Sequence, residues 1–142
     1  MAINTSKILV GGIVGGIVAN VIDFVSQTYI LADMGKAAMA KLNLPTTPSG
    51  SSLVWLILLD FVWIIANVWI YAAIRPRFGP GPRTAAYAGL VSWVIGGTVA
   101  GFFGLSGLFG LNLFIASSIV ALINSLVSTI VGARFYTEDA TT

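Results

Sequence analysis

The segment LVWLILLDFVWIIANVWIYAAI, from Leu53 to Ile74, decides the fold of this chain. Apart from Asp60 it contains no charged residue, and an α-helix rises about 1.5 Å per residue. A helix of this length therefore matches the hydrocarbon core of a bilayer, which is about 30 Å thick. An uninterrupted apolar run of this kind is typical of a membrane span rather than of a buried helix in a water-soluble protein.

Three more segments have the same character, and together the four predict spans at about residues 7–31, 53–74, 85–108 and 111–135. The whole chain is 57% hydrophobic and only 8% charged. Soluble domains are about a quarter charged, so this chain could not cover a surface in contact with water. We expect one all-α membrane domain over residues 1–142, a polytopic four-transmembrane-helix bundle.

The three connections differ in composition. Residues 33–42 are rich in alanine and begin at Asp33, a good N-cap, which predicts a short interfacial helix between the first two spans. Residues 75–83 hold three prolines, which fix φ and forbid continuation of a helix, so we expect a stiff basic turn. Residues 106–110 are rich in glycine and uncharged, which predicts a tight hairpin between the last two spans.

The stretch WIYAAIRPRFGPGPRTA, from Trp69 to Ala85, resembles small uncharacterised bacterial four-helix integral membrane proteins. Those proteins carry a similar proline-rich basic turn after their second helix. The resemblance implies a bacterial inner (cytoplasmic) membrane as the location, and it implies no activity.

Basic residues set the expected orientation. Five of them, Lys7, Arg75, Arg77, Arg83 and Arg134, fall on one side of the predicted bundle, and Lys36 and Lys41 fall on the other. Cytoplasmic loops retain Lys and Arg, so we expect both termini in the cytoplasm. The cluster of Arg75, Arg77 and Arg83 either anchors this topology or also holds the headgroups of anionic membrane lipids.

The composition excludes several classes of chemistry. Cysteine and histidine are both absent, which argues against disulfides, iron–sulfur clusters, zinc sites and nucleophile–histidine catalysis. We therefore expect no catalytic residue, no metal centre, no cofactor and no enzymatic activity. The net charge of +2 comes from scattered basic residues in a lipid-embedded chain, so we expect no nucleic-acid partner.

Two carboxyl groups, those of Asp23 and Asp60, fall inside predicted spans. An ionisable side chain there costs about 2.5–3.5 kcal/mol on insertion scales, so each needs a reason. If the first two spans are antiparallel neighbours, both carboxyls lie at one depth, about 10 Å below the outer surface. Two close carboxylates in a medium of low dielectric repel, so one holds a proton or a cation lies between them.

Polar residues accompany each aspartate at helical spacing. Asn20 and Gln27 share a stripe with Asp23 on the first span, and Asn67 shares one with Asp60 on the second. These five residues form the predicted proton or cation site. The alternative is that they only join helices, because Asn, Gln and protonated Asp hydrogen-bond across helix interfaces in membranes.

Glycine pairs at four-residue spacing mark surfaces where helices approach closely. The first span has two such pairs, Gly11 with Gly15 and Gly12 with Gly16, and the third span has Gly97 with Gly101. Two small-residue surfaces on one helix exceed what a single neighbour needs. We therefore expect one of them to contact another subunit or a partner protein, the alternative being a compact monomeric bundle.

These patterns favour a non-enzymatic structural or accessory membrane protein that packs through its glycine faces in a homo-oligomer or a larger membrane complex. The main alternative is a small oligomeric proton- or cation-linked transporter or channel that uses the aspartate pair. Membrane lipids are the other expected partners.

Overall fold

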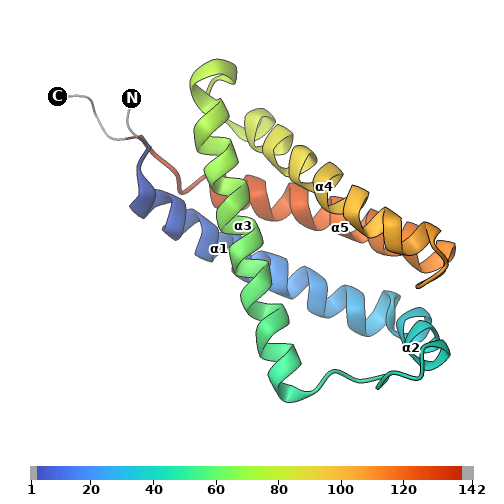
Figure 1. Cartoon of the computed structure of the whole chain (residues 1–142). Coiled ribbons are helices and arrows are strands. Elements are labelled where there is room, and N and C mark those ends of the chain that lie inside the picture. The colour runs from blue at the N-terminus through green and yellow to red at the C-terminus, as the bar shows by residue number, and fades with distance from the viewer. Residues whose placement is uncertain (1–2, 139–142) are drawn as a thin grey trace.

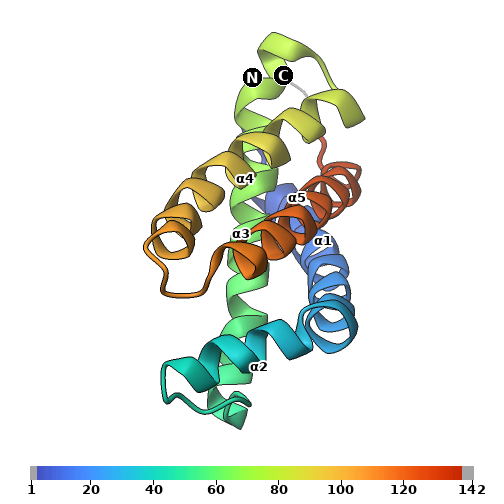
Figure 2. The same ribbon diagram turned by 90° about the vertical axis from the view of Figure 1, so that its right-hand side faces the viewer.

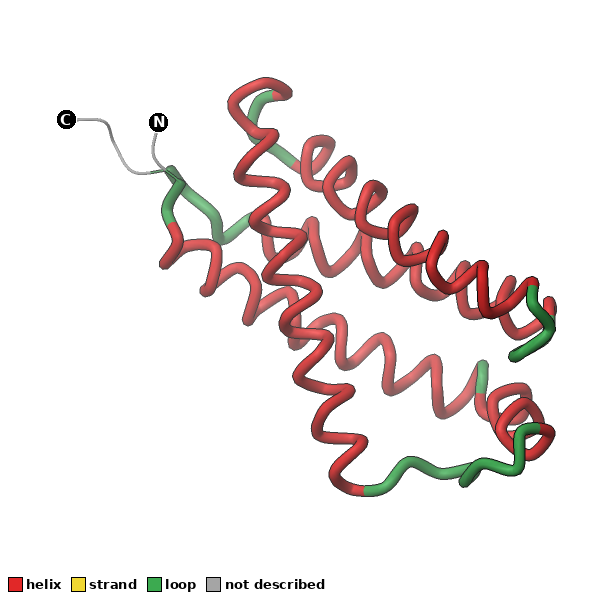
Figure 3. Tube along the Cα trace, viewed as in Figure 1, coloured by secondary structure: helices red, strands yellow, loops and turns green. Residues whose placement is uncertain are grey.

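The structure is a computed structural model that describes residues 3–138; positions 1–2 and 139–142 of the predicted domain lie outside the described part. The described part is helical and contains no strand (Figures 1 and 3). The elements are α1 (Thr5–Val25), a π-helical turn η1 (Ser26–Ile30), α2 (Ala32–Lys41), α3 (Gly50–Phe78), α4 (Pro82–Leu105) and α5 (Leu111–Ala133).

Four of these segments, Thr5–Ile30, Gly50–Phe78, Pro82–Leu105 and Leu111–Ala133, are long and apolar enough to cross a membrane. The prediction of an all-α, polytopic membrane protein is therefore confirmed, and α2 is the short helix expected between the first two spans. Polar side chains define where two spans begin. The side chain of Asn4 accepts a hydrogen bond from the backbone N–H of Lys7, and Ser49 caps α3 in the same way through Ser52.

One boundary prediction is wrong, because α3 continues through Pro76 and ends at Phe78. A proline near the end of a helix removes only one backbone hydrogen bond, and its fixed φ is compatible with the helix. The turn is correspondingly short, and side chains satisfy its backbone: Thr84 Oγ1 donates to the Gly79 carbonyl at 2.7 Å, and the Gly81 N–H donates to the Tyr71 hydroxyl at 3.2 Å.

The four spans form a ring in which α1 packs against α3 and α5, while α4 packs against α5 and α3. Helices α3 and α5 also touch across the centre. Figures 1 and 2 show α3 crossing the other spans at a steep angle, so that its N-terminal half runs away from α4 and α5. All side chains from Gly50 to Leu59 are consequently exposed.

Both glycine surfaces of α1 are covered inside the chain, contrary to our expectation of a partner protein. A Cβ atom on Gly11 would lie 2.5 Å from the carbonyl oxygen of Gly132 on α5. On the other surface, a Cβ on Gly12 would clash with Ile65 and one on Gly16 with Phe61, both on α3. The prediction assumed one neighbour for α1, whereas the steep crossing of α3 gives it two.

The glycine pair on α4 also differs from expectation. A Cβ on Gly101 would lie 3.5 Å from the ring of Phe114, which is ordinary contact, whereas a Cβ on Gly97 would meet nothing within 4 Å. Gly97 therefore packs against no other helix in the described chain.

The distribution of side chains is that of a protein dissolved in lipid. Large apolar residues such as Phe24 (67% exposed) and Phe102 (76%) point outward. Polar residues occupy the centre, where Asn67, Ser128 and Thr129 are completely buried. In lipid, apolar side chains gain nothing by turning inward, and small or hydrogen-bonding residues make the helix contacts.

The two ends of the bundle carry different groups. At what we call the terminus end, the N–H of Asn4 donates to the hydroxyl of Tyr136 at 3.4 Å. Here Arg75 pairs with Glu138 at 3.4 Å and lies over the Tyr136 ring, so it is engaged within the protein. Arg77 is exposed at the same end. The opposite end, which we call the α2 end, carries α2 and the 106–110 hairpin.

Candidate functional site

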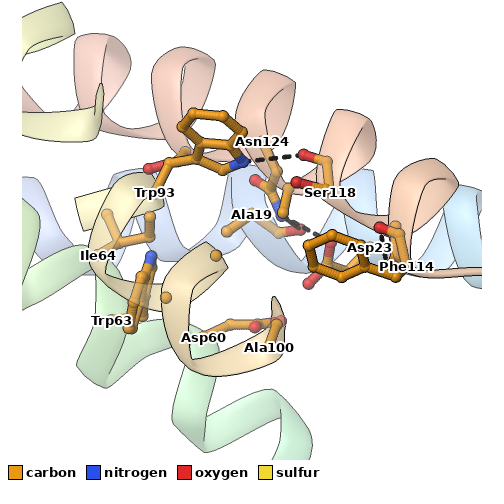
Figure 4. Close-up of a pocket in the computed structure, with 15 residues that line it drawn as sticks. Ala19, Asp23, Asp60, Trp63, Ile64, Trp93, Ala100, Phe114, Ser118 and Asn124 are labelled. Carbon is orange, nitrogen blue, oxygen red and sulfur yellow. Dashed lines mark hydrogen bonds between the residues drawn. The ribbon is translucent and has the colours of Figure 1, made fainter. Parts of the chain in front are cut away.

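A cavity of about 350 Å³ lies between the four spans, in the half of the bundle nearer the α2 end. Asp23 from α1 and Asp60 from α3 both line it, as Figure 4 shows. The two carboxyl groups are near enough to influence each other electrostatically. The structure therefore brings the two predicted aspartates together in one cavity.

Asp23 is fixed by a short hydrogen-bond chain from α5. The side-chain amide of Asn124 donates to Asp23 Oδ1 at 2.7 Å and also to the Ala19 carbonyl at 3.2 Å. The hydroxyl of Ser128 in turn donates to Asn124 Oδ1 at 2.8 Å. These bonds orient the Asn124 amide, so its NH₂ group faces the carboxyl (Figure 4). Asp23 therefore has a structural partner as well as a place in the cavity.

Asp60 has a different environment: it is half-buried in the cavity wall, near the carboxyl of Asp23. No Lys or Arg is among the described residues that line the cavity. Nothing at the site therefore neutralises the pair, and two carboxylates in a medium of low dielectric repel each other strongly. The arrangement is stable with a shared proton or with a bound cation, and it is suited chemically to exchanging one for the other.

Three aromatic rings form much of the remaining wall, and each is held by a specific contact. Trp93 Nε1 donates to the Ser118 carbonyl at 2.9 Å, which fixes the indole across α4 and α5. The ring of Trp63 lies against Gly96, where a Cβ would come within 2.9 Å of it. Phe114 is packed on Gly104 in the same manner, at 2.7 Å.

Two of the other predicted site residues join helices outside the cavity. Asn67 is completely buried, and its amide donates to Thr129 Oγ1 at 2.9 Å and to Ser125 Oγ at 3.3 Å, which ties α3 to α5. Asn20 donates to the carbonyl of Gly16 on its own helix and to that of Ile57 on α3. The alternative interpretation of these two residues, as helix joiners, matches their contacts.

Gln27 lies away from the site, and its side chain is exposed. It belongs to the π-helical turn η1, in which the hydrogen bonds span five residues rather than four. Gln27 is therefore not part of the cavity lining that contains Asp23 and Asp60.

Sequence reasoning missed Trp93 and Phe114 as wall residues. One signal was available for the tryptophan: it stands in the middle of α4, whereas indoles in membrane proteins are enriched near the interfaces. An indole N–H at mid-span needs an acceptor inside the protein, and Ser118 supplies it. Phe114 gives no comparable signal in so apolar a chain.

Comparison with known proteins adds no further identification. We found no match to this chain among protein-family models, curated proteins or solved structures.

Proposed function

We propose that this chain is a small proton- or cation-linked membrane transporter or channel, in which Asp23 and Asp60 bind the cation. The observation that carries the proposal is that two carboxyl groups line one cavity within the spans, near enough to influence each other electrostatically, with no basic side chain among the described lining residues. Placing a carboxylate inside a membrane span costs about 2.5–3.5 kcal/mol. A contact between two helices can be made by uncharged side chains, without this cost.

A role in joining helices explains the presence of Asp23 but not that of Asp60. Asp23 bonds to Asn124 across α1 and α5, as a purely structural carboxyl would. Asp60 instead faces Asp23, an arrangement that destabilises the helix contact whenever both groups are ionised. Such a contact is useful where the pair takes up and releases positive charge.

The proposal includes a location and an orientation. We place the protein in a bacterial inner membrane, with the terminus end in the cytoplasm, because most basic residues lie at that end. The aspartate cavity then opens nearer the outer surface. Exposed Arg77 and Arg83 serve as topology anchors that also contact anionic lipid headgroups. The activity is transport, with no chemical conversion of a substrate.

Flux measurements test the proposal. Purified protein in liposomes is expected to carry a current or a proton flux that depends on pH, and Asp60→Asn and Asp23→Asn are expected to abolish it while the helical content is unchanged. Asp33→Asn, the same change in exposed α2, is the matched control and is expected to leave the flux intact. Absence of flux in the native protein, or unchanged flux in Asp60→Asn, rules the proposal out.

A second candidate function is that of an accessory subunit in a homo-oligomer or larger membrane complex. The observation favouring it is the start of α3, residues 50–59, which is exposed along its whole length and includes Trp55 at 66% exposure. The covered glycine rows of α1 no longer support it. A mildly solubilised native sample that migrates as a single chain of 14.9 kDa without a co-purifying protein would exclude this candidate.

A further inference from the structure

We propose that the cavity selects an organic cation with an apolar body, whose charged head lies at Asp23 and Asp60 and whose body lies against Trp63, Trp93 and Phe114. This inference rests on the proposed function and names the class of its substrate. It follows from the size of the cavity, the shortage of metal ligands and the nature of the walls.

The size of the cavity exceeds what a proton or a bare metal ion requires. Its volume is about 350 Å³, whereas one water molecule takes up about 30 Å³ of the liquid. Pockets that hold small organic molecules begin at about 300 Å³ and are lined mostly by apolar side chains with a few polar groups. The cavity has both properties, because its wall is mainly aromatic, alanine and glycine.

The charged oxygen ligands at the site are fewer than hard metal cations usually take from a protein. Ca²⁺ takes about six to eight oxygen ligands, mostly carboxylates, carbonyls and waters. Within residues 3–138 no group of three or more Asp, Glu, His or Cys side chains gathers at one place. Of the hydroxyls that line the cavity, that of Ser125 already accepts a hydrogen bond from Asn67 and donates one to the Gly89 carbonyl. Two carboxyls suit a single positive head better than a metal shell.

The aromatic walls supply the second half of the recognition. A quaternary or protonated amine is attracted to the face of an indole or phenyl ring, and the attraction is stronger where water is excluded. Trp93 is already held by its hydrogen bond to the Ser118 carbonyl, so that indole loses little side-chain freedom on binding. Gly97 lines the cavity without a neighbour and leaves the space between these walls open.

The charge balance links this cation to a proton. Asp23 on α1 and Asp60 on α3 are the only titratable side chains among the described residues that line the cavity, and the lining residues of α4 and α5 are uncharged. A pair of adjacent carboxyls in lipid favours a single net negative charge, so a proton and an organic cation compete for it. Affinity for the cation is therefore expected to rise with pH.

Direct binding to the purified full chain tests the inference, with benzyltrimethylammonium as the probe and calorimetry as the measurement. We expect saturable binding that weakens by about tenfold or more in Asp60→Asn and in Trp63→Ala. Asp33→Asn and Trp69→Ala, the same changes at exposed positions outside the cavity, are expected to bind like the native protein. The uncharged isostere neopentylbenzene is expected not to compete.

A variant that fills the cavity distinguishes a specific loss of binding from a loss of the fold. Gly97→Leu adds a side chain where a Cβ meets nothing, so it is expected to keep the native thermal unfolding midpoint and to abolish probe binding. If benzyltrimethylammonium does not bind, or binds equally to Gly97→Leu, the inference is overturned. If the probe fails to bind in this way but the aspartate-dependent proton flux is present, only the inference about the organic cation is wrong and the proposed function stands. If the flux is absent as well, both the inference and the proposed function are wrong.

Discussion

At the scale of single residues, glycines of similar spacing differ in what a side chain would meet. Gly11 lies so close to α5 that its missing Cβ would come within 2.5 Å of the Gly132 carbonyl oxygen. The reciprocal Cβ on Gly132 would lie 2.6 Å from the Gly11 carbonyl oxygen. Gly97 faces open space instead. The first two glycines allow the backbones to touch, and the third leaves room in the cavity.

This difference predicts opposite effects of the same substitution. Gly11→Ala is expected to destabilise the bundle by about 1–3 kcal/mol, because the carbonyl it meets is rigid backbone and the helices must separate. Gly97→Ala is expected to be neutral or stabilising by up to about 1 kcal/mol, because alanine favours the helix and meets nothing. Unfolding in detergent mixtures with increasing SDS, followed by circular dichroism, measures both.

Equal stability of the two variants would contradict the close contact between α1 and α5. It would also reopen the possibility that the Gly11 surface faces a partner protein rather than the chain itself.

At the scale of elements, buried polar side chains of α5 tie the bundle together. Ser125 donates to the Gly89 carbonyl on α4, and Asn67 of α3 bonds to both Ser125 and Thr129. Asn124 reaches α1 through Asp23 and Ala19. One face of α5 therefore contacts all three other spans by hydrogen bonds, which are favourable in lipid because no water competes for the same groups.

Asn67→Ala is expected to destabilise the protein by about 1–2 kcal/mol, since it removes two interhelical hydrogen bonds worth about 0.6 kcal/mol each and leaves a small void. The loss is limited because Asn67 Oδ1 is buried without a hydrogen-bond partner, so its removal also relieves a desolvation cost. Detergent unfolding monitored by circular dichroism again gives the value.

Gln27→Ala provides the control, because it truncates a similar amide side chain at an exposed position. It is expected to change stability by less than about 0.5 kcal/mol. A larger effect at Gln27 than at Asn67 would show that the hydrogen bonds between α3 and α5 contribute little.

At the scale of the whole molecule, four spans return the chain to the side from which it starts. The contact of Asn4 with Tyr136 brings the two ends of the described chain together, and the α2–α3 connection lies at the opposite end (Figure 1). The basic residues near the terminus end predict that this end is cytoplasmic.

Cysteine labelling tests this topology, because the chain has no cysteine of its own. Thr46→Cys lies in the α2–α3 connection and Pro80→Cys in the α3–α4 turn, and both positions are exposed. A membrane-impermeant maleimide added to intact spheroplasts is expected to label position 46 alone, and to label position 80 only after permeabilisation. The reverse pattern would invert the orientation, and labelling of both from outside would contradict the four-span topology.

Much of this protein could be predicted from local sequence. Hydropathy identified all four spans because each must satisfy its own backbone and present apolar side chains to lipid, whatever its neighbours are. Asp23 and Asp60 were recognisable for the same reason: a carboxyl inside an apolar span is unusual before any packing is known. The antiparallel connection of the first two spans predicted that the two would lie near each other, and both line one cavity.

Tertiary structure alone decided which surfaces meet. Helices α3 and α5 together cover both glycine rows of α1, and Gln27 lies outside the cavity that Asp23 lines. Trp93 and Phe114 became cavity walls only through contacts with residues distant in the chain. Hydropathy is a property of each segment by itself, whereas crossing angles depend on the fit between helices, and no single helix carries that information.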